Sequence, residues 1–167
     1  MRILGIDPGL QVCGYAVIEA ADAGQQFIEA GIFRTDGNSA IEERLHIIAE
    51  DTKSLLKKFR PDVVAVEELY SHYAHPKTAI LMGHARGVIL QKCAEAAIAV
   101  RSFSATRIKK SLTGNGRASK EQVQRTIQTI LSLSAVPEPN DVADAVAVAM
   151  CCANSISSLA VVMNAKR

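Results

Sequence analysis

The sequence lacks any long apolar stretch, and this absence narrows the classes of protein to which it can belong. No run among its 167 residues reaches the ~18 uninterrupted apolar residues that a membrane-spanning helix needs. The opening residues 1–7 include Asp7 where a secretory signal peptide has apolar residues. Hydrophobic residues make up 49% of the chain, and its length suits one domain. We therefore expect a soluble, cytoplasmic protein with a single core and no membrane partner.

Cysteines are few, and their spacing is not that of a metal site. The four cysteines include no Cys-x-x-Cys pair, and no His-x-x-x-His spacing accompanies them: Cys13, Cys93, Cys151 and Cys152. A structural zinc site is therefore not expected. We predict reduced and mostly buried thiols that pack as small apolar side chains. Cys13 stands near the acidic residues discussed below, so a reactive thiol at that position is the alternative.

Net charge is small, at +2, but positive charge is concentrated in one segment. Residues 101–125 contain a single acidic residue and seven basic ones, namely Arg101, Arg107, Lys109, Lys110, Arg117, Lys120 and Arg125. A surface of this kind suits a polyanion such as a nucleic acid. The alternative is an ordinary solvated helix face and loop.

Hydrophobic patterning predicts five strands. Apolar runs at 2–7, 14–19 and 26–35 are separated by short turn signals, which indicates three neighbouring antiparallel strands. Two further strands are predicted at 63–67 and about 99–103. The first of these is continuously apolar, as expected for a central strand that is covered on both faces.

Helical periodicity alternates with the later strands. The predicted helices cover about 39–59, 76–99, 105–112, 119–133 and 140–154. Ser119, with Gln122 three residues later, forms the capping box of the fourth helix. The order βββαβαβααα describes an α/β fold, with one mixed five-stranded sheet flanked by helices. We expect this domain to cover 1–154 and to be followed by a partly disordered tail at 155–167.

Four acidic residues stand where burial makes a carboxylate costly. Asp7 and Glu67 each end an apolar strand, and Asp141 and Asp144 precede one of the most apolar helices of the chain. The spacing of three places Asp141 and Asp144 on one helix face. Buried carboxylates are costly when unpaired, and they repel one another when gathered. Divalent cations remove both penalties, and oxygen ligands without His or Cys favour Mg²⁺ or Mn²⁺ over zinc.

Each of these acids has a second interpretation when it is taken alone. Asp7 before Pro8-Gly9 is suited to starting a turn, and Asp141 is suited to the positive end of a helix dipole. Asp144, one turn further in, fits the dipole explanation less well. Glu67 and its neighbour Glu68 point to opposite faces of a strand, so periodicity leaves open which of the two faces the site.

Four motifs, in order, resemble those of the RuvC family of Holliday-junction resolvases. They are Gly5-Ile6-Asp7-Pro8-Gly9 with Gly14-Tyr15, Val66-Glu67-Glu68-Leu69-Tyr70, Gly83-His84-Ala85-Arg86-Gly87, and Asp141-Val142-Ala143-Asp144 with the alanine-rich segment that follows. The resemblance extends to about Asn154. It implies an RNase H-like fold and a homodimer that makes paired, symmetric cuts in four-way DNA junctions during recombination and repair. It also implies RuvA and RuvB type branch-migration proteins as partners.

The resemblance further assigns roles to single residues. It makes Asp7, Glu67, Asp141 and Asp144 both catalytic and metal-binding, which favours Glu67 over Glu68. Two Mg²⁺ ions per subunit would then drive hydrolysis of the phosphodiester, with Mn²⁺ as a substitute. No nucleophilic side chain is needed, in keeping with the lack of a Ser-His or Cys-His signature.

The DNA-binding residues implied by the resemblance come from two regions. Tyr70 matches an aromatic position, usually Phe, that stacks on bases near the crossover. A partly buried loop aromatic is its alternative. Lys109 and Lys120 match basic positions near the scissile phosphate. Further basic residues are expected to hold the DNA backbone without reading sequence, namely Arg107, Lys110 and Arg117.

Gly83 and Gly87 lie one turn apart in a predicted helix, where each costs about 1 kcal/mol relative to Ala. The cost is understandable if another backbone approaches closely. We predict that this helix forms the dimer contact, since an isologous dimer places two active sites symmetrically. Close packing inside one subunit is the alternative.

Three other classes of protein share part of this pattern. Actin-like ATPases have a similar opening motif but need two such domains to enclose a nucleotide. Nucleases of RNase H type that process structured RNA share the first motif but lack the Asp-x-x-Asp ending. A non-catalytic junction-binding protein is disfavoured because four acids facing DNA weaken binding unless metal ions neutralise them.

Overall fold

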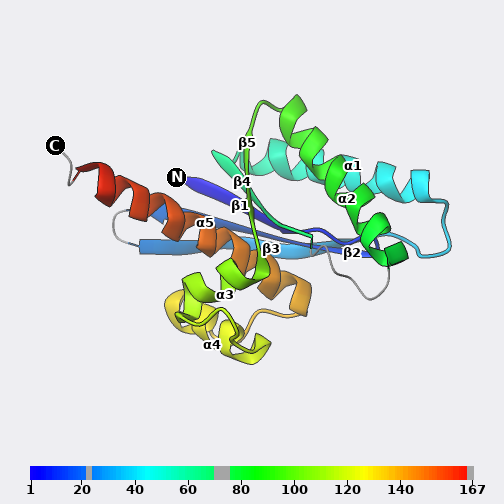
Figure 1. Ribbon diagram of the computed structural model, residues 1–167. Coiled ribbons are helices and arrows are strands. Elements are labelled where there is room, and N and C mark those ends of the chain that lie inside the picture. The colour runs from blue at the N-terminus through cyan, green and yellow to red at the C-terminus, as the bar shows by residue number, and fades with distance from the viewer. Residues whose placement is uncertain (22–23, 70–75, 165–167) are drawn as a thin grey trace.

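The computed structural model describes residues 1–21, 24–69 and 76–164, and its centre is one five-stranded sheet (Figure 1). The strand order is β3-β2-β1-β4-β5. The first three strands pair antiparallel, whereas β4 runs parallel to β1 and β5 parallel to β4. The mixed five-stranded sheet predicted from the sequence is therefore confirmed. The strand bounds are β1 (Arg2–Asp7), β2 (Val12–Ala21), β3 (Gly24–Arg34), β4 (Val63–Glu67) and β5 (Ala99–Phe103).

Five helices cover the two faces of the sheet in the part of the chain that is described (Figure 1). One face carries α1 (Ile41–Phe59) and α2 (Pro76–Glu95), and the other carries α3 (Ala105–Thr113), α4 (Lys120–Ile130) and α5 (Asn140–Asn164). The element order is the predicted one. None of these helices combines the length and the apolar character that crossing a membrane requires.

Helix α5 is longer than the sequence predicted, since it ends at Asn164 rather than near Asn154. A partly disordered tail was expected because the resemblance to the RuvC family extends only to about Asn154. In the structure, the hydroxyls of Ser157 and Ser158 donate to the carbonyls of Ala153 and Asn154, so these side chains bond within the helix instead of ending it. Much of the expected tail is thus continuous with α5. The domain boundary at residue 154 stays a prediction.

Two glycines let α5 approach the sheet closely. A Cβ on Gly5 of β1 would lie 2.2 Å from the carbonyl oxygen of Ala145, and a Cβ on Gly14 of β2 would lie 1.9 Å from that of Asp141. Any side chain larger than hydrogen would therefore push the helix away. Because Gly14 pairs with Asp7 across the β1–β2 ladder, the contact holds the first turn of α5 over the end of β1.

The middle of α5 forms the centre of the core on its face of the sheet. Every residue from Ala145 to Ala153 is buried, and these residues pack with Ile3, Ala65 and Ile127 among others. On the opposite face, Leu4 and Val64 pack against α1 and α2. Alternate residues of β1 and β4 thus point to opposite faces, as strand geometry requires.

Candidate active site

The predicted acids gather where β1, β4 and α5 meet. Asp7 and Glu67 end neighbouring parallel strands, so both stand at the same edge of the sheet. Both point to the face of α5, because Gly5 and Ala65, two positions earlier in each strand, contact that helix or its cluster. Asp141 lies in the first turn of α5 and Asp144 one turn further on. Four acids from three distant segments of the chain therefore share one region.

Burial and mutual repulsion alter the ionisation of these acids. The pKa of Asp7 is raised from 3.8 to about 7, mainly by burial and then by the charges of Glu67, Asp144 and Asp141. The pKa of Glu67 is also raised, first by burial and then by the charge of Asp144. Lys120 lowers both pKa values, but its effect is smaller. The site therefore carries negative charge that the protein does not neutralise.

The structure distinguishes Glu67 from Glu68. Glu67 lines a hollow of about 190 Å³ together with Asp144, Lys109 and Lys120. Glu68 is exposed, and its backbone N–H donates to the carbonyl of Phe103. Of the two neighbours, Glu67 faces the other acids.

Lys120 is placed by the start of α4. The Ser119 side chain accepts a hydrogen bond from the backbone of Gln122, whose side chain bonds back to Ser119, so the predicted capping box is confirmed. Lys120 is the first residue of this helix, and its Nζ lies 3.1 Å from Asp144 Oδ2. Half-buried Lys109 comes from α3 and lines the same hollow. The site therefore has two cations beside its carboxylates.

The donor set fits a divalent cation. No three acidic, histidine or cysteine side chains of the described residues stand close enough to hold an ion as they lie. The carboxylates of Asp7, Glu67 and Asp141 nevertheless accept no hydrogen bond from any other described residue, and their charges repel one another. A hard cation with oxygen ligands is the group that relieves this repulsion.

Stability without metal should depend on pH through Asp7. Its pKa is about 7 in the folded chain and about 3.8 when unfolded, so ionisation is harder in the folded state. Folded-state stability should therefore fall as pH rises from about 4 and level off above about 7, by roughly 2 kcal/mol because solvent still reaches the site. Urea unfolding in EDTA at pH 5 and pH 8 measures this. The Asp7→Asn variant should lose most of the decrease and keep the part that comes from Glu67, and equal profiles for both proteins would contradict the assignment.

Cys13 fixes the turn that follows Asp7. The thiol donates to the carbonyl of Gly9 at 3.0 Å, and the sulfur accepts from the backbone N–H of Gly9 at 3.2 Å. Burial raises the pKa of this thiol to about 12, so it is protonated at neutral pH and not nucleophilic. Its burial and its hydrogen bonds to Gly9 therefore favour a structural role over a reactive thiol. All four cysteines are free and buried, as predicted.

The comparison with known proteins decides the family. Residues 3–152 match the model of the family described as crossover junction endodeoxyribonuclease RuvC.

The chain belongs to the RuvC family.

The RuvC of Rhodopirellula baltica is 46% identical over 149 residues, which cover 89% of this chain and 84% of that one. A structure of Thermus thermophilus RuvC superposes with a TM-score of 0.88 at 31% identity, covering 95% of this chain and 96% of that one. The same coverage holds for Thermus thermophilus RuvC in complex with a Holliday junction substrate, with a TM-score of 0.87 and 29% identity. The RuvC resemblance seen in the four motifs and the RNase H-like fold are thus confirmed. Membership of the RuvC family implies the use of a divalent metal ion, but it does not specify which ion.

The other residues assigned by the RuvC resemblance differ in where they lie relative to the acidic site. Lys109 and Lys120 lie at the acidic site, as described above. Arg107 and Lys110 are exposed on α3, and Arg117 is exposed in the loop before α4. Tyr70 lies outside the described residues.

Sequence reasoning missed Arg86, which holds the end of β4 from the opposite face of the sheet. Its Nε donates to the backbone carbonyl of Glu67 at 3.3 Å, and its guanidinium donates to the Ser102 hydroxyl at 2.8 Å. Arg86 lies inside the Gly-His-Ala-Arg-Gly motif of RuvC proteins, so its position was the available signal. Its contact becomes visible only once α2 is packed beside β4.

The two glycines of α2 make no close contact with the residues that the structure describes. A Cβ on Gly87 would meet no atom of the described residues within 4 Å, and one on Gly83 would meet only Leu69 Cδ1, at 3.8 Å. Packing against the described residues of the same subunit therefore does not explain Gly87, and the dimer contact stays a prediction. The same helix exposes Ile80, with 61% of its surface accessible.

Proposed function

We propose that this RuvC-family chain is an endonuclease that resolves four-way DNA junctions by paired, symmetric nicks, in homologous recombination and DNA repair. One observation carries the proposal: four carboxylates converge at the ends of β1 and β4 beneath the first turns of α5, with Lys109 and Lys120 beside them. The junction complex of Thermus thermophilus RuvC supports it. The enzyme would act in the cytoplasm, alongside branch-migration proteins of RuvA and RuvB type.

The chemistry assigned to the site is hydrolysis of a phosphodiester. Asp7, Glu67, Asp141 and Asp144 would hold two Mg²⁺ ions per subunit, for which Mn²⁺ would substitute. Bound Mg²⁺ supplies charge that activates water and stabilises the anionic transition state. The strands and helix fix the carboxylates, and Lys109 and Lys120 attract the phosphate and orient it. No side chain acts as a nucleophile.

Cleavage of an end-labelled synthetic four-way junction tests the proposal. With Mg²⁺, we expect nicks at symmetric positions in two opposed strands, and no cutting of linear duplexes that have the same arm sequences. Tight binding without cutting, over several junction sequences and with Mn²⁺ as well, would instead indicate a non-catalytic junction-binding protein. If junctions are neither bound nor cut, structured RNA becomes the substrate to test.

We further propose that α2 contacts a second copy of the chain around Gly83 and Gly87. Glycine is otherwise costly in a helix interior, and within the subunit nothing described occupies the space beside Gly87. An approaching backbone from a partner gives this space a use. Exposed Ile80, about one turn from Gly83 and about two turns from Gly87 on the same helix, adds apolar surface to that contact.

Gly87→Leu should separate subunit stability from dimerisation. Leu favours helix more than Gly does and meets open space, so unfolding of the monomer should be unchanged or harder by up to about 1 kcal/mol. The dimer dissociation constant measured by sedimentation should rise at least about tenfold. Thr129→Leu, at an exposed position of α4 on the opposite face, is the control and should leave it unchanged. An unaltered dimer in Gly87→Leu would place the contact elsewhere.

A further inference from the structure

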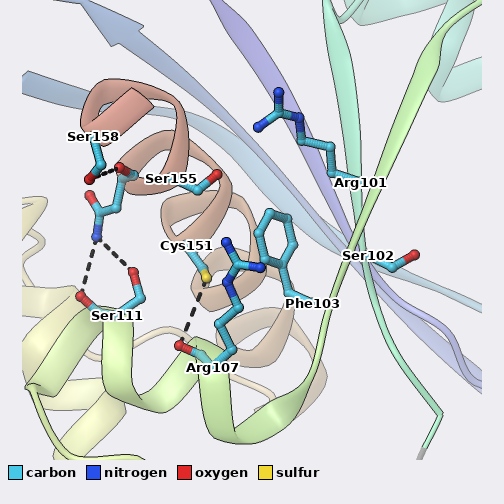
Figure 2. A pocket seen from close by; sticks show the side chains of 9 residues that line it. Arg101, Ser102, Phe103, Arg107, Ser111, Cys151, Ser155 and Ser158 are labelled. Carbon is cyan, nitrogen blue, oxygen red and sulfur yellow. Dashed lines mark hydrogen bonds between the residues drawn. The ribbon is translucent and has the colours of Figure 1, made fainter. Parts of the chain in front are cut away.

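A second pocket, separate from the acidic site, lies between β5, α3 and α5, and has a volume of about 550 Å³ (Figure 2). We call it the β5–α3–α5 pocket. Its lining includes two arginines and several hydroxyls, and no acidic residue is among the described residues that line it. The residues that matter for its chemistry are Arg101 and Phe103 of β5, Arg107 and Ser111 of α3, and Ser155 and Ser158 of α5.

The two arginines carry charge that is not balanced locally. Neither forms an ion pair with an acid among the described residues. The Arg107 guanidinium lies 5.0 Å from the centre of the Phe103 ring, which restricts its position. Figure 2 shows Arg101 extending from β5 on the other side of that ring. The pocket thus presents one guanidinium group from each of two elements, and a guanidinium group is well suited to phosphate oxygens.

The wall formed by α3 and α5 is held by a hydrogen-bond network. Asn154 Nδ2 donates to the hydroxyl of Ser111 at 3.1 Å and to its carbonyl at 3.3 Å (Figure 2). Gln25 of β3 donates to Asn154 Oδ1 at 2.8 Å, which fixes the amide in this orientation. The Ser111 hydroxyl accepts from Asn154 and is also hydrogen-bonded to the neighbouring Cys151 thiol, so its proton can turn from Cys151 to a ligand in the pocket. The pocket is therefore built before any ligand arrives.

The β5–α3–α5 pocket lies next to the acidic site on the same face of the sheet. Phe103, which lines it, pairs with Glu67 across the β4–β5 ladder. Helix α3 separates the two hollows, with Lys109 lining the acidic one and Arg107 the other. Along α5, Cys151 and Ser155 lie roughly 10 and 16 Å from Asp144, at 1.5 Å per residue. At about 3.4 Å of duplex axis per phosphate in one strand, this interval spans roughly three to five phosphates.

We propose that the β5–α3–α5 pocket binds a backbone phosphate of the DNA, about three to five nucleotides from the phosphate that is cut. The inference rests on the proposed function, since it takes the bound DNA as the source of the phosphodiester. Arg101 and Arg107 bind the phosphate oxygens, and Ser111 donates a further hydrogen bond. The pocket fixes the course of the strand beyond the acidic site, and so helps to set which phosphate reaches the carboxylates.

A thermodynamic cycle between protein and DNA tests this assignment. The protein variant carries Arg101→Gln and Arg107→Gln, and the DNA variant carries one uncharged methylphosphonate, moved along the strand on either side of the cut. All binding is measured in an Asp7→Asn background so that the junction stays intact. With the unsubstituted arginines, a methylphosphonate at one position three to five nucleotides from the cut should weaken binding about tenfold. With both arginines replaced, the same methylphosphonate should change binding less than about twofold.

Salt dependence gives a second measurement. Replacing both arginines should lower the slope of log Kobs against log salt by about 1, the value for one phosphate contact. Arg34→Gln is the control, because Arg34 is exposed on β3 at the opposite edge of the sheet, and it should leave the slope unchanged. Equal slopes for the double variant and the control, or methylphosphonate effects that persist without the arginines, would overturn the proposal.

The outcomes of these experiments distinguish a failure of this inference from a failure of the proposed function. If wild-type protein nicks junctions but the cycle shows no coupling, only the phosphate pocket is wrong. If wild-type protein neither binds nor nicks junctions, the proposed function fails first. Titration with a free nucleoside monophosphate covers the other source of phosphate. Binding of this nucleotide that needs both arginines, with junction affinity independent of them, would identify a nucleotide site and overturn the assignment to the DNA backbone.

Discussion

Asp7→Asn is expected to lower the rate of junction cleavage by about 10³-fold or more while junction binding is retained. Asp7 is central to the group, since its pKa is raised by the charges of Glu67, Asp141 and Asp144 together. An amide has nearly the same shape but no charge, so it weakens cation binding without emptying the site. Removal of one negative charge facing the DNA should hold affinity constant or increase it. Single-turnover cleavage and gel-shift binding of the same labelled junction measure the two effects.

Glu68→Gln is the matched control for this substitution. It makes the same kind of charge change one residue beyond Glu67, but Glu68 is exposed and does not line the hollow that holds Asp144 and Lys120. Its cleavage rate should stay within about twofold of the wild type. An Asp7→Asn protein that keeps more than a tenth of wild-type cleavage would remove Asp7 from the catalytic group. A loss of equal size in both variants would show that general charge, and not position, is responsible.

Gly14→Ala is expected to destabilise the protein by about 3 kcal/mol and to lower cleavage about 100-fold in the molecules that remain folded. The added methyl group would lie 1.9 Å from the backbone oxygen of Asp141, which is rigid and cannot rotate away. Helix α5 must therefore move off β2, which costs packing and displaces Asp141 and Asp144 from Asp7. Urea unfolding gives the first effect. Cleavage measured well below the unfolding midpoint gives the second.

Gly37→Ala provides the comparison for Gly14→Ala. The nearest atom to a Cβ at Gly37 is the amide nitrogen of Gln11, at 2.9 Å, at the far end of a flexible side chain. That side chain can turn away, so the variant should lose less than about 1 kcal/mol and keep its activity. If Gly14→Ala were as stable and active as Gly37→Ala, the close approach of α5 would not be what positions the acids.

Local patterns in the sequence were sufficient for the strands of the sheet, and the resemblance to the RuvC family was sufficient for the grouping of the four acids. Strand periodicity predicted β1 and β4. Their last residues, Asp7 and Glu67, each follow an apolar run that defines where the strand ends. The spacing of Asp141 and Asp144 predicted a shared helix face for the same reason. All of these inferences depend on residues that are close together along the chain, and local patterns record such relations well.

Contacts between distant segments were not predictable in the same way. Gly14 carries no local sign that the carbonyl of Asp141 lies against it, and nothing near Arg86 shows that its guanidinium holds the end of β4. The extension of α5 was missed because the family resemblance ends near Asn154, whereas Ser157 and Ser158 bond within the helix and continue it. The β5–α3–α5 pocket joins residues as far apart as Arg101 and Ser158. Its arginines could be recognised as basic residues in the sequence, but their location in one pocket could not be predicted.

The burial of the middle of α5 fixes the position of this helix relative to the sheet. From Ala145 to Ala153 no side chain faces solvent, so the helix has no free surface along which it can slide or roll. Its first turns carry the acids, and its later turns line the β5–α3–α5 pocket. The distance between the acids and the β5–α3–α5 pocket is therefore set by the rise per residue of the helix. The apolar core around α5 thus stabilises the fold and also sets the spacing along the DNA between the phosphate that is cut and the phosphate bound in the β5–α3–α5 pocket.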